Sequence, residues 1–168
     1  SRTICSFYYN NFTLFHFHCI KNNAFGDEMY WQHTCNSPEH NSWAGLAFEK
    51  VCFQHIPQIK NALGISGVMS NVCSWRTEKT DEHPGVQIDM LISRRDDVVN
   101  LCEMKYYSGE YLITEADAKD FAVKSGVFRQ LSGTKASVHM TLITSYGVAS
   151  NKYSSSIQSF LTFDDLFS

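Results

Sequence analysis

Positive charge is scarce in this sequence. Only 14 of its 168 residues are Lys or Arg, against 17 Asp or Glu, and the formal net charge is −3. A domain that binds nucleic acid tightly without regard to sequence carries a basic patch or stripe. The composition therefore counts against that class. It does not exclude an enzyme that acts on nucleic acid, because the metal site of such an enzyme is itself acidic.

Other absences narrow the class of protein further. No stretch approaches the ~20 consecutive apolar residues of a transmembrane helix, and the first residues lack the basic region and apolar core of a signal peptide. The six cysteines form no CxxC pair, which predicts reduced thiols rather than a disulfide framework. We therefore predict a cytoplasmic protein. The chain does not begin with methionine, so we expect a piece of a longer protein.

Enough apolar residues are present for a folded domain, since 43% of the chain is hydrophobic and 14% is aromatic. Residues 1–36 are rich in aromatic side chains. We predict that they are an N-terminal extension, the end of a preceding region, with a short helix over 11–21. Residues 37–168 form the predicted domain.

Within that domain the sequence alternates between helix and strand patterns. The predicted order is a helix, three strands, a helix, a strand, and a short strand, over residues 37–63, 68–75, 86–93, 98–107, 114–132, 138–145 and 157–163. Pro57 predicts a break of the first helix near His55, and Thr114 with Asp117 resembles a capping box at the start of the second. This order predicts an α/β fold, with a mixed sheet flanked by helices and an α-β-β-β-α-β core.

Charged residues interrupt two otherwise apolar strands of this predicted sheet. Asp89 lies in the strand over 86–93, and Glu103 and Lys105 lie in the strand over 98–107. The period-two alternation of strands puts Glu103 and Lys105 on one face, and a hairpin would bring Asp89 beside them. Burying such carboxylates unpaired costs several kcal/mol, so the pattern indicates a site.

Glu49 completes the predicted constellation. Its neighbours three and four positions away along the helix, Gly45, Leu46, Cys52 and Phe53, are all non-polar, so Glu49 should face the core or a site. Carboxylates from neighbouring strands can hold Mg²⁺, which polarises a phosphate ester and lowers the pKa of bound water. A lysine beside them can stabilise the charge that develops in the reaction.

The same residues have a plainer interpretation. An aspartate and a Glu-x-Lys sequence on adjacent strands form an ordinary cross-strand ion pair on many solvated sheet faces. The spacing alone does not decide between this and a metal site, and both interpretations stay open at this point.

The wider sequence resembles a known family. The segment Gly85-Val-Gln-Ile-Asp89, followed by Asn100-Leu-Cys-Glu103-Met-Lys105, resembles the PD-(D/E)XK nuclease superfamily, which has a restriction-endonuclease-like fold. More narrowly, the chain resembles the C-terminal nuclease-like domain of a group of bacterial and archaeal P-loop ATPases. That likeness extends over Trp43-Ala-Gly-Leu-Ala-Phe-Glu49, Gln54-His-Ile-Pro-Gln-Ile-Lys-Asn-Ala-Leu-Gly-Ile65, Thr141-Leu-Ile-Thr-Ser-Tyr-Gly147 and Asp164-Asp-Leu-Phe167. The superfamily often has proline before the aspartate, where this chain has Ile88.

The resemblance implies a role for each residue of the motif. It makes Asp89 and Glu103 metal ligands, Lys105 the catalytic lysine and Glu49 the acid of the first helix. It also implies that Met104 offers its backbone carbonyl to the metal. The candidates for contact with nucleic acid are Gln87, Lys124 and Arg129, although cations on a helix surface are more often simply solvated.

We therefore predict a Mg²⁺-dependent nuclease domain (Mn²⁺ being the alternative metal) that hydrolyses phosphodiester bonds in DNA. Its expected partners are DNA and an ATPase domain of the same parent chain, with no membrane and with the oligomeric state open. No GxxxxGK[ST] loop is present, so an ATPase motor would lie outside this sequence. The alternative function is a catalytically silent module of the same fold that binds nucleic acid or a partner protein.

Overall fold

The computed structural model describes residues 15–16, 20–21, 26–35 and 37–168. Most of the predicted helix over 11–21 lies outside these residues. The chain divides into two compact units, Ser1–Val51 and Cys52–Ser168, and each is described by itself. The division falls inside a helix, later than the boundary at residue 37 that the sequence predicts. No helix in the described part of the chain is both long enough and apolar enough to cross a membrane.

The first unit contains α2 (Tyr30–Thr34) and most of α3 (Pro38–Gln54). The hydroxyl of Ser37 accepts a hydrogen bond from the backbone amide of His40, at 3.1 Å, which satisfies one of the unpaired donors in the first turn of α3. The ring of Trp43 packs edge-on against that of Phe15, with 5.5 Å between centroids.

The helical region is broken where the sequence predicts. The helix α3 ends at Gln54, and α4 (Ile56–Ala62) starts again with Pro57 in its first turn. Proline is tolerated in a first helical turn because a backbone amide at that position has no acceptor within the helix, so no hydrogen bond is lost. Gly64 follows α4 with a φ of 68°, a left-handed conformation that a glycine adopts without steric cost.

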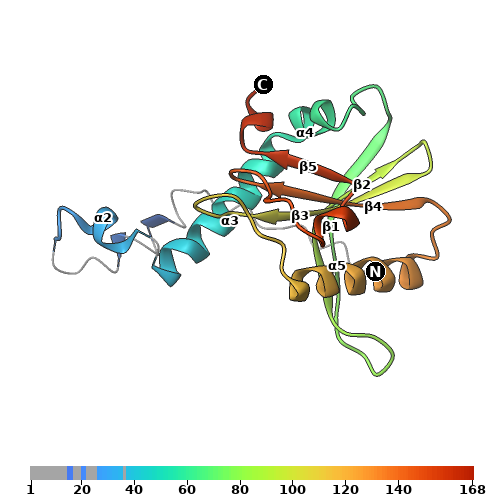
Figure 1. The fold of residues 1–168 in the computed structure, drawn as a ribbon, viewed down its shortest axis with the longest axis horizontal. Coiled ribbons are helices and arrows are strands. Elements are labelled where there is room, and N and C mark those ends of the chain that lie inside the picture. The colour runs from blue at the N-terminus through green and yellow to red at the C-terminus, as the bar shows by residue number, and fades with distance from the viewer. Residues whose placement is uncertain (1–14, 17–19, 22–25, 36) are drawn as a thin grey trace. The chain divides into compact units, whose positions relative to one another are not determined.

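A five-stranded mixed sheet forms the centre of the second unit (Figure 1). The strands are β1 (Ser70–Thr77), β2 (Val86–Arg94), β3 (Val98–Lys105), β4 (Ser137–Thr144) and β5 (Ser159–Thr162). They lie in the order β1-β2-β3-β4-β5. The first three pair antiparallel, and β3, β4 and β5 pair parallel. The predicted α/β fold, with a mixed sheet flanked by helices, is confirmed.

The parallel pair of β3 and β4 requires a crossover, and α5 (Glu115–Ser132) supplies it. Its capping box is present as predicted, because the hydroxyl of Thr114 accepts from the amide of Asp117 while the Asp117 carboxylate accepts from the amide of Thr114. The buried side chains of α5 are Phe121, Val127 and Phe128. Ala122, the next residue after Phe121, is exposed.

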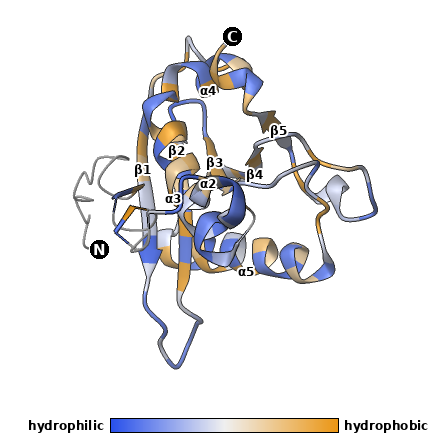
Figure 2. Ribbon diagram, turned by 90° about the vertical axis from the view of Figure 1, so that its left-hand side faces the viewer, coloured by the Kyte–Doolittle hydropathy of each residue, from blue (hydrophilic) through white to orange (hydrophobic). Residues whose placement is uncertain are grey.

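The core lies between α5 and one face of the sheet. Its strand members include Leu91, Leu101, Met140 and Leu142, packed with Phe121 of α5. Both faces of β3 and β4 are buried, which explains why these strands read as nearly continuous apolar runs. By contrast, Figure 2 shows the projecting loop between β1 and β2 as hydrophilic.

Candidate active site

The site begins with an irregularity in β2. Between Cys73 and Trp75, β1 has one intervening residue, whereas the paired segment of β2 from Leu91 to Ile88 has two. A strand with one extra residue forms a β-bulge, which bends the strand and redirects a side chain. Asp89 is one of the two residues in that interval.

The redirected Asp89 side chain reaches β3. The register between β2 and β3 ends at Met90 and Cys102, and just beyond that point the Asp89 Oδ2 atom accepts a hydrogen bond from the backbone amide of Met104, at 2.9 Å. The carboxylate therefore lies in the opening between the two strands. The amide and carbonyl of one strand residue point to the same edge, so the Met104 carbonyl faces this opening as well.

Glu103 lies next to Asp89 and is almost completely buried, with 1% of its surface exposed. One of its oxygens, Oε2, accepts a hydrogen bond from the Lys124 ammonium at 2.6 Å. The other, Oε1, is buried and has no hydrogen-bond partner among the described residues. Burial, followed by the nearby Asp89 carboxylate, raises the pKa of Glu103 to about 7.

Two lysines approach Glu103 from different elements. The Lys105 ammonium, at the end of β3, lies 3.9 Å from Glu103 Oε2, and its side chain is 34% exposed. Lys124 on α5 is only 13% exposed and also contacts Asp120, at 3.1 Å. Burial works to lower the pKa of Lys124, but the Glu103 and Asp120 carboxylates outweigh it and the pKa is raised.

A second group beside Lys105 was not predicted from the sequence. The Tyr111 side chain lies near Asp117, the residue that closes the capping box of α5. Burial, and then this neighbouring carboxylate, raise the pKa of Tyr111. Partial burial tends to raise the pKa of Asp117, but the hydrogen bonds from Thr114, the nearby Tyr111 side chain and the charge of Lys105 lower it overall. The capping residue thus links the start of α5 to the site.

The other predicted residues are placed as follows. Lys124, predicted to contact phosphate, points at the buried carboxylate of Glu103. Gln87 is exposed and pairs with Arg76, in the regularly paired part of β2 that precedes the irregular interval. Arg129 donates to the carbonyl of Val138, near the opposite end of β4. Glu49 lies in the first unit, on α3, and its approach to the site stays a prediction.

Two carboxylates of the second unit, Asp89 and Glu103, offer oxygen ligands of the kind that a hard divalent cation takes. The described part of the chain contains no group of three or more His, Cys, Asp or Glu side chains arranged to hold a metal ion. Mg²⁺, however, is often bound through one or two carboxylates together with substrate phosphates and water. The buried Glu103 Oε1 without a hydrogen-bond partner, beside a second carboxylate that raises its pKa, is a donor set of that kind.

Comparison with known proteins identifies no family. No protein-family model and no curated protein matches the chain. A solved structure, titled "Crystal Structure of Protein of Unknown Function AF1548", is similar at 16% identity and a TM-score of 0.43. The match covers 66% of this chain and 56% of that one, so the chain spans less than two thirds of that protein's length.

Proposed function

We propose that the chain is a PD-(D/E)XK-type nuclease domain that hydrolyses phosphodiester bonds in DNA with the help of Mg²⁺ or Mn²⁺. The observation that carries the proposal is the Glu103 Oε1 atom, which is buried and has no hydrogen-bond partner among the described residues. The Asp89 carboxylate raises the pKa of this glutamate, and the Lys105 ammonium lies 3.9 Å from its other oxygen. An unpaired buried carboxylate oxygen destabilises a protein. A cation bound there would remove that cost.

The Asp89 and Glu103 carboxylates would hold the metal, with the Met104 carbonyl as a further oxygen donor. When bound, Mg²⁺ supplies positive charge that polarises the phosphoryl group and lowers the pKa of the attacking water. The hydrogen bond from the Met104 amide fixes the Asp89 carboxylate in the opening between β2 and β3, so the ligand is positioned before the metal arrives.

Lys105 is suited to act on the substrate, because about a third of its side chain is exposed while its ammonium lies near Glu103. It would orient the attacking water or stabilise the negative charge on the phosphorane. Gln87 and Arg129 remain candidates for contact with the DNA backbone, and Glu49 for the acid of the first helix. In the parent chain an ATPase domain would precede this one, as the sequence resemblance implies.

One observation favours the second candidate, a catalytically silent module that binds nucleic acid or a partner protein. Lys124 lies 2.6 Å from the Glu103 carboxylate, where it neutralises the charge that would attract a metal. In a protein of this fold that binds no metal, the Lys124 ammonium could serve as the counter-ion of the buried Glu103 carboxylate.

Metal binding separates these candidates. We would titrate Mn²⁺ and Mg²⁺ into wild type, Asp89→Ala and Glu103→Gln by calorimetry, and follow cleavage of labelled DNA in the same buffers. Glu82→Gln is the matched control, since Glu82 is an exposed acid in the loop between β1 and β2. The nuclease proposal expects binding and cleavage that both site variants lose and the control keeps. If wild type binds no metal and cuts no DNA, the nuclease proposal is wrong and the catalytically silent module remains.

A further inference from the structure

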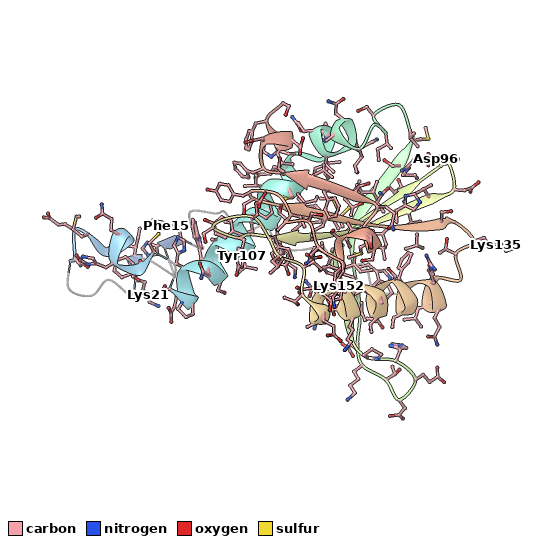
Figure 3. The ribbon with its side chains drawn as sticks, viewed as in Figure 1. Phe15, Lys21, Asp96, Tyr107, Lys135 and Lys152 are labelled. Carbon is pink, nitrogen blue, oxygen red and sulfur yellow. The ribbon has the colours of Figure 1, made fainter. Side chains whose placement is uncertain are left out.

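A hollow lies at the edge of the sheet where the three parallel strands end. It is lined by residues that follow β3, follow β4, or end and follow β5, namely Tyr106, Ser145, Tyr146, Thr162, Phe163 and Asp164. Tyr106 is the residue after Lys105, so their Cα atoms are about 3.8 Å apart. The hollow therefore lies at the same end of β3 as the candidate active site. Figure 3 labels Asp96 and Tyr107, which lie beyond the two ends of β3. Tyr107 is beyond the end at which the hollow lies.

Aromatic rings dominate the accessible surface of this hollow. Tyr146 is 64% exposed, and Tyr106 and Phe163 are each 38% exposed. The Phe163 ring also packs against that of Phe167, with 4.9 Å between centroids, and the exposed parts of the three rings forgo the stabilisation that burial would bring. A cluster of three at one place indicates a surface that binds something flat and apolar.

The walls of the hollow are held by hydrogen bonds. The Ser145 hydroxyl accepts from the amide of Tyr107 at 2.8 Å and donates to its carbonyl at 2.5 Å. Thr162 donates from both its amide and its hydroxyl to the Asp165 carboxylate, at 2.7 and 2.9 Å. The first pair connects the segments that follow β3 and β4, and the second pair closes the turn after β5, so the backbone that carries the rings is held by hydrogen bonds.

The aromatic surface also continues toward the candidate active site. The ring of Tyr107, which is 54% exposed, lies edge-on to that of Tyr111, with 5.7 Å between centroids. Tyr111 in turn lies near Asp117, whose carboxylate feels the charge of Lys105. Aromatic side chains therefore lie between the segment that follows β3 and the start of α5.

The candidate active site and the hollow differ in charge, and so in the ligands that they can bind. Lys105 and Lys124 gather beside Glu103, whereas the described residues that line the hollow include no lysine, arginine or histidine and one carboxylate, Asp164. A carboxylate beside aromatic rings repels phosphate, but it accepts hydrogen bonds from the amino groups of bases. The hollow is therefore complementary to a nucleobase and not to the backbone that carries it.

We propose that this hollow binds an unpaired nucleobase of the strand whose phosphate lies at Asp89, Glu103 and Lys105. The inference rests on the proposed function and names its substrate class: single-stranded nucleic acid, or the unpaired end of a duplex. Bases inside an intact duplex are stacked on their neighbours and paired, so they present no free face to the hollow.

The test compares two single-stranded oligonucleotides of equal length, one with bases and one abasic, by fluorescence anisotropy in metal-free buffer where no cleavage occurs. Wild type should bind the strand with bases about fivefold more tightly or better, the gain expected from at least one stacked base. Tyr146→Ala and Phe163→Ala should each lose most of that preference and keep their affinity for the abasic strand and for a blunt duplex. Tyr146→Leu, which keeps the bulk but not the π-face, guards against a folding defect and should behave like Tyr146→Ala.

Phe160→Ala is the matched control, because Phe160 is 44% exposed on β5 but does not line the hollow. It should keep the full preference for bases. Wild type that binds both single strands equally would overturn the inference and leave the proposed function standing. Wild type that binds neither single strand would also overturn the inference, whereas the proposed function is decided by metal binding and cleavage. Asp89→Asn separates the two further, since it should lose metal binding and keep the preference for bases.

Discussion

The carboxylate of Asp89 completes the hydrogen bonding of β3, because it accepts from the Met104 amide just beyond the point where β2 stops pairing. The same carboxylate lies close enough to Glu103 to raise the pKa of that buried acid. Asp89 therefore stabilises the fold through the Met104 amide and destabilises it through repulsion with Glu103. Substitutions of Asp89 can separate these two effects.

Asp89→Ala should lower the free energy of unfolding by about 1–3 kcal/mol, since it leaves the Met104 amide without its acceptor. Asp89→Asn keeps a carbonyl oxygen for that bond and removes the repulsion with Glu103. We expect it to be at least as stable as wild type in metal-free buffer. Urea denaturation of the three proteins tests this order. If Asp89→Asn loses as much stability as Asp89→Ala, the charge belongs to a structural ion-pair cluster and not to a metal site.

The stability of the protein should fall as the pH rises from about 4.5 to 7. Glu103 has a folded-state pKa of about 7 against an ordinary value of 4.5, so the folded state binds more protons than the unfolded chain across this interval, and ionisation favours unfolding. The loss is on the order of 3 kcal/mol. Glu103→Gln should remove this part of the slope. The comparison requires denaturation curves of both proteins at several pH values, and parallel curves would contradict the assignment.

Lys124 should stabilise the fold only while Glu103 is charged. At pH 8, Lys124→Met should cost on the order of 3 kcal/mol, because it leaves a buried carboxylate without its closest cation. In the Glu103→Gln background the same substitution should cost much less. A double-mutant cycle measures the difference as a coupling energy, and a coupling near zero would show that the 2.6 Å contact does not contribute to stability.

Lys105→Ala, unlike Lys124→Met, should change the cleavage rate and not the stability. Its ammonium is partly exposed and lies 3.9 Å from Glu103, so its removal should change stability little, since an exposed pair contributes about 0–1 kcal/mol. Under the proposed function it removes charge stabilisation of the transition state, which reduces the cleavage rate on the order of 10²–10³. Single-turnover cleavage assays together with thermal unfolding test both parts. Unimpaired cleavage by a well-folded variant would remove Lys105 from the chemistry.

The sequence predicts the elements where local rules govern them. The capping box at Thr114 and the break before Pro57 each depend on a few adjacent residues, and both occur in the structure. The position of Asp89 beside β3 was also predictable, because hairpin partners lie side by side whatever else the chain does.

Contacts between distant elements were not predictable in the same way. The extra residue in β2 lies between Ile88 and Leu91 and breaks the alternation of the strand there. The pairing of Lys124 with Glu103 spans 21 residues and depends on how α5 crosses the sheet. Tyr111 stands in a connecting segment with no periodicity, so no pattern linked it to Asp117 before the fold was known.

The crossover through α5 has a consequence for the order of folding. The β2–β3 hairpin closes through a short turn and can form early, whereas β4 and Lys124 join only after α5 has crossed the sheet, and contacts that close longer loops form more slowly. We therefore expect the two carboxylates to meet before their buried counter-ion arrives. Their repulsion acts on the early hairpin, so a proton or a divalent cation that reaches Glu103 first would speed the assembly of the sheet.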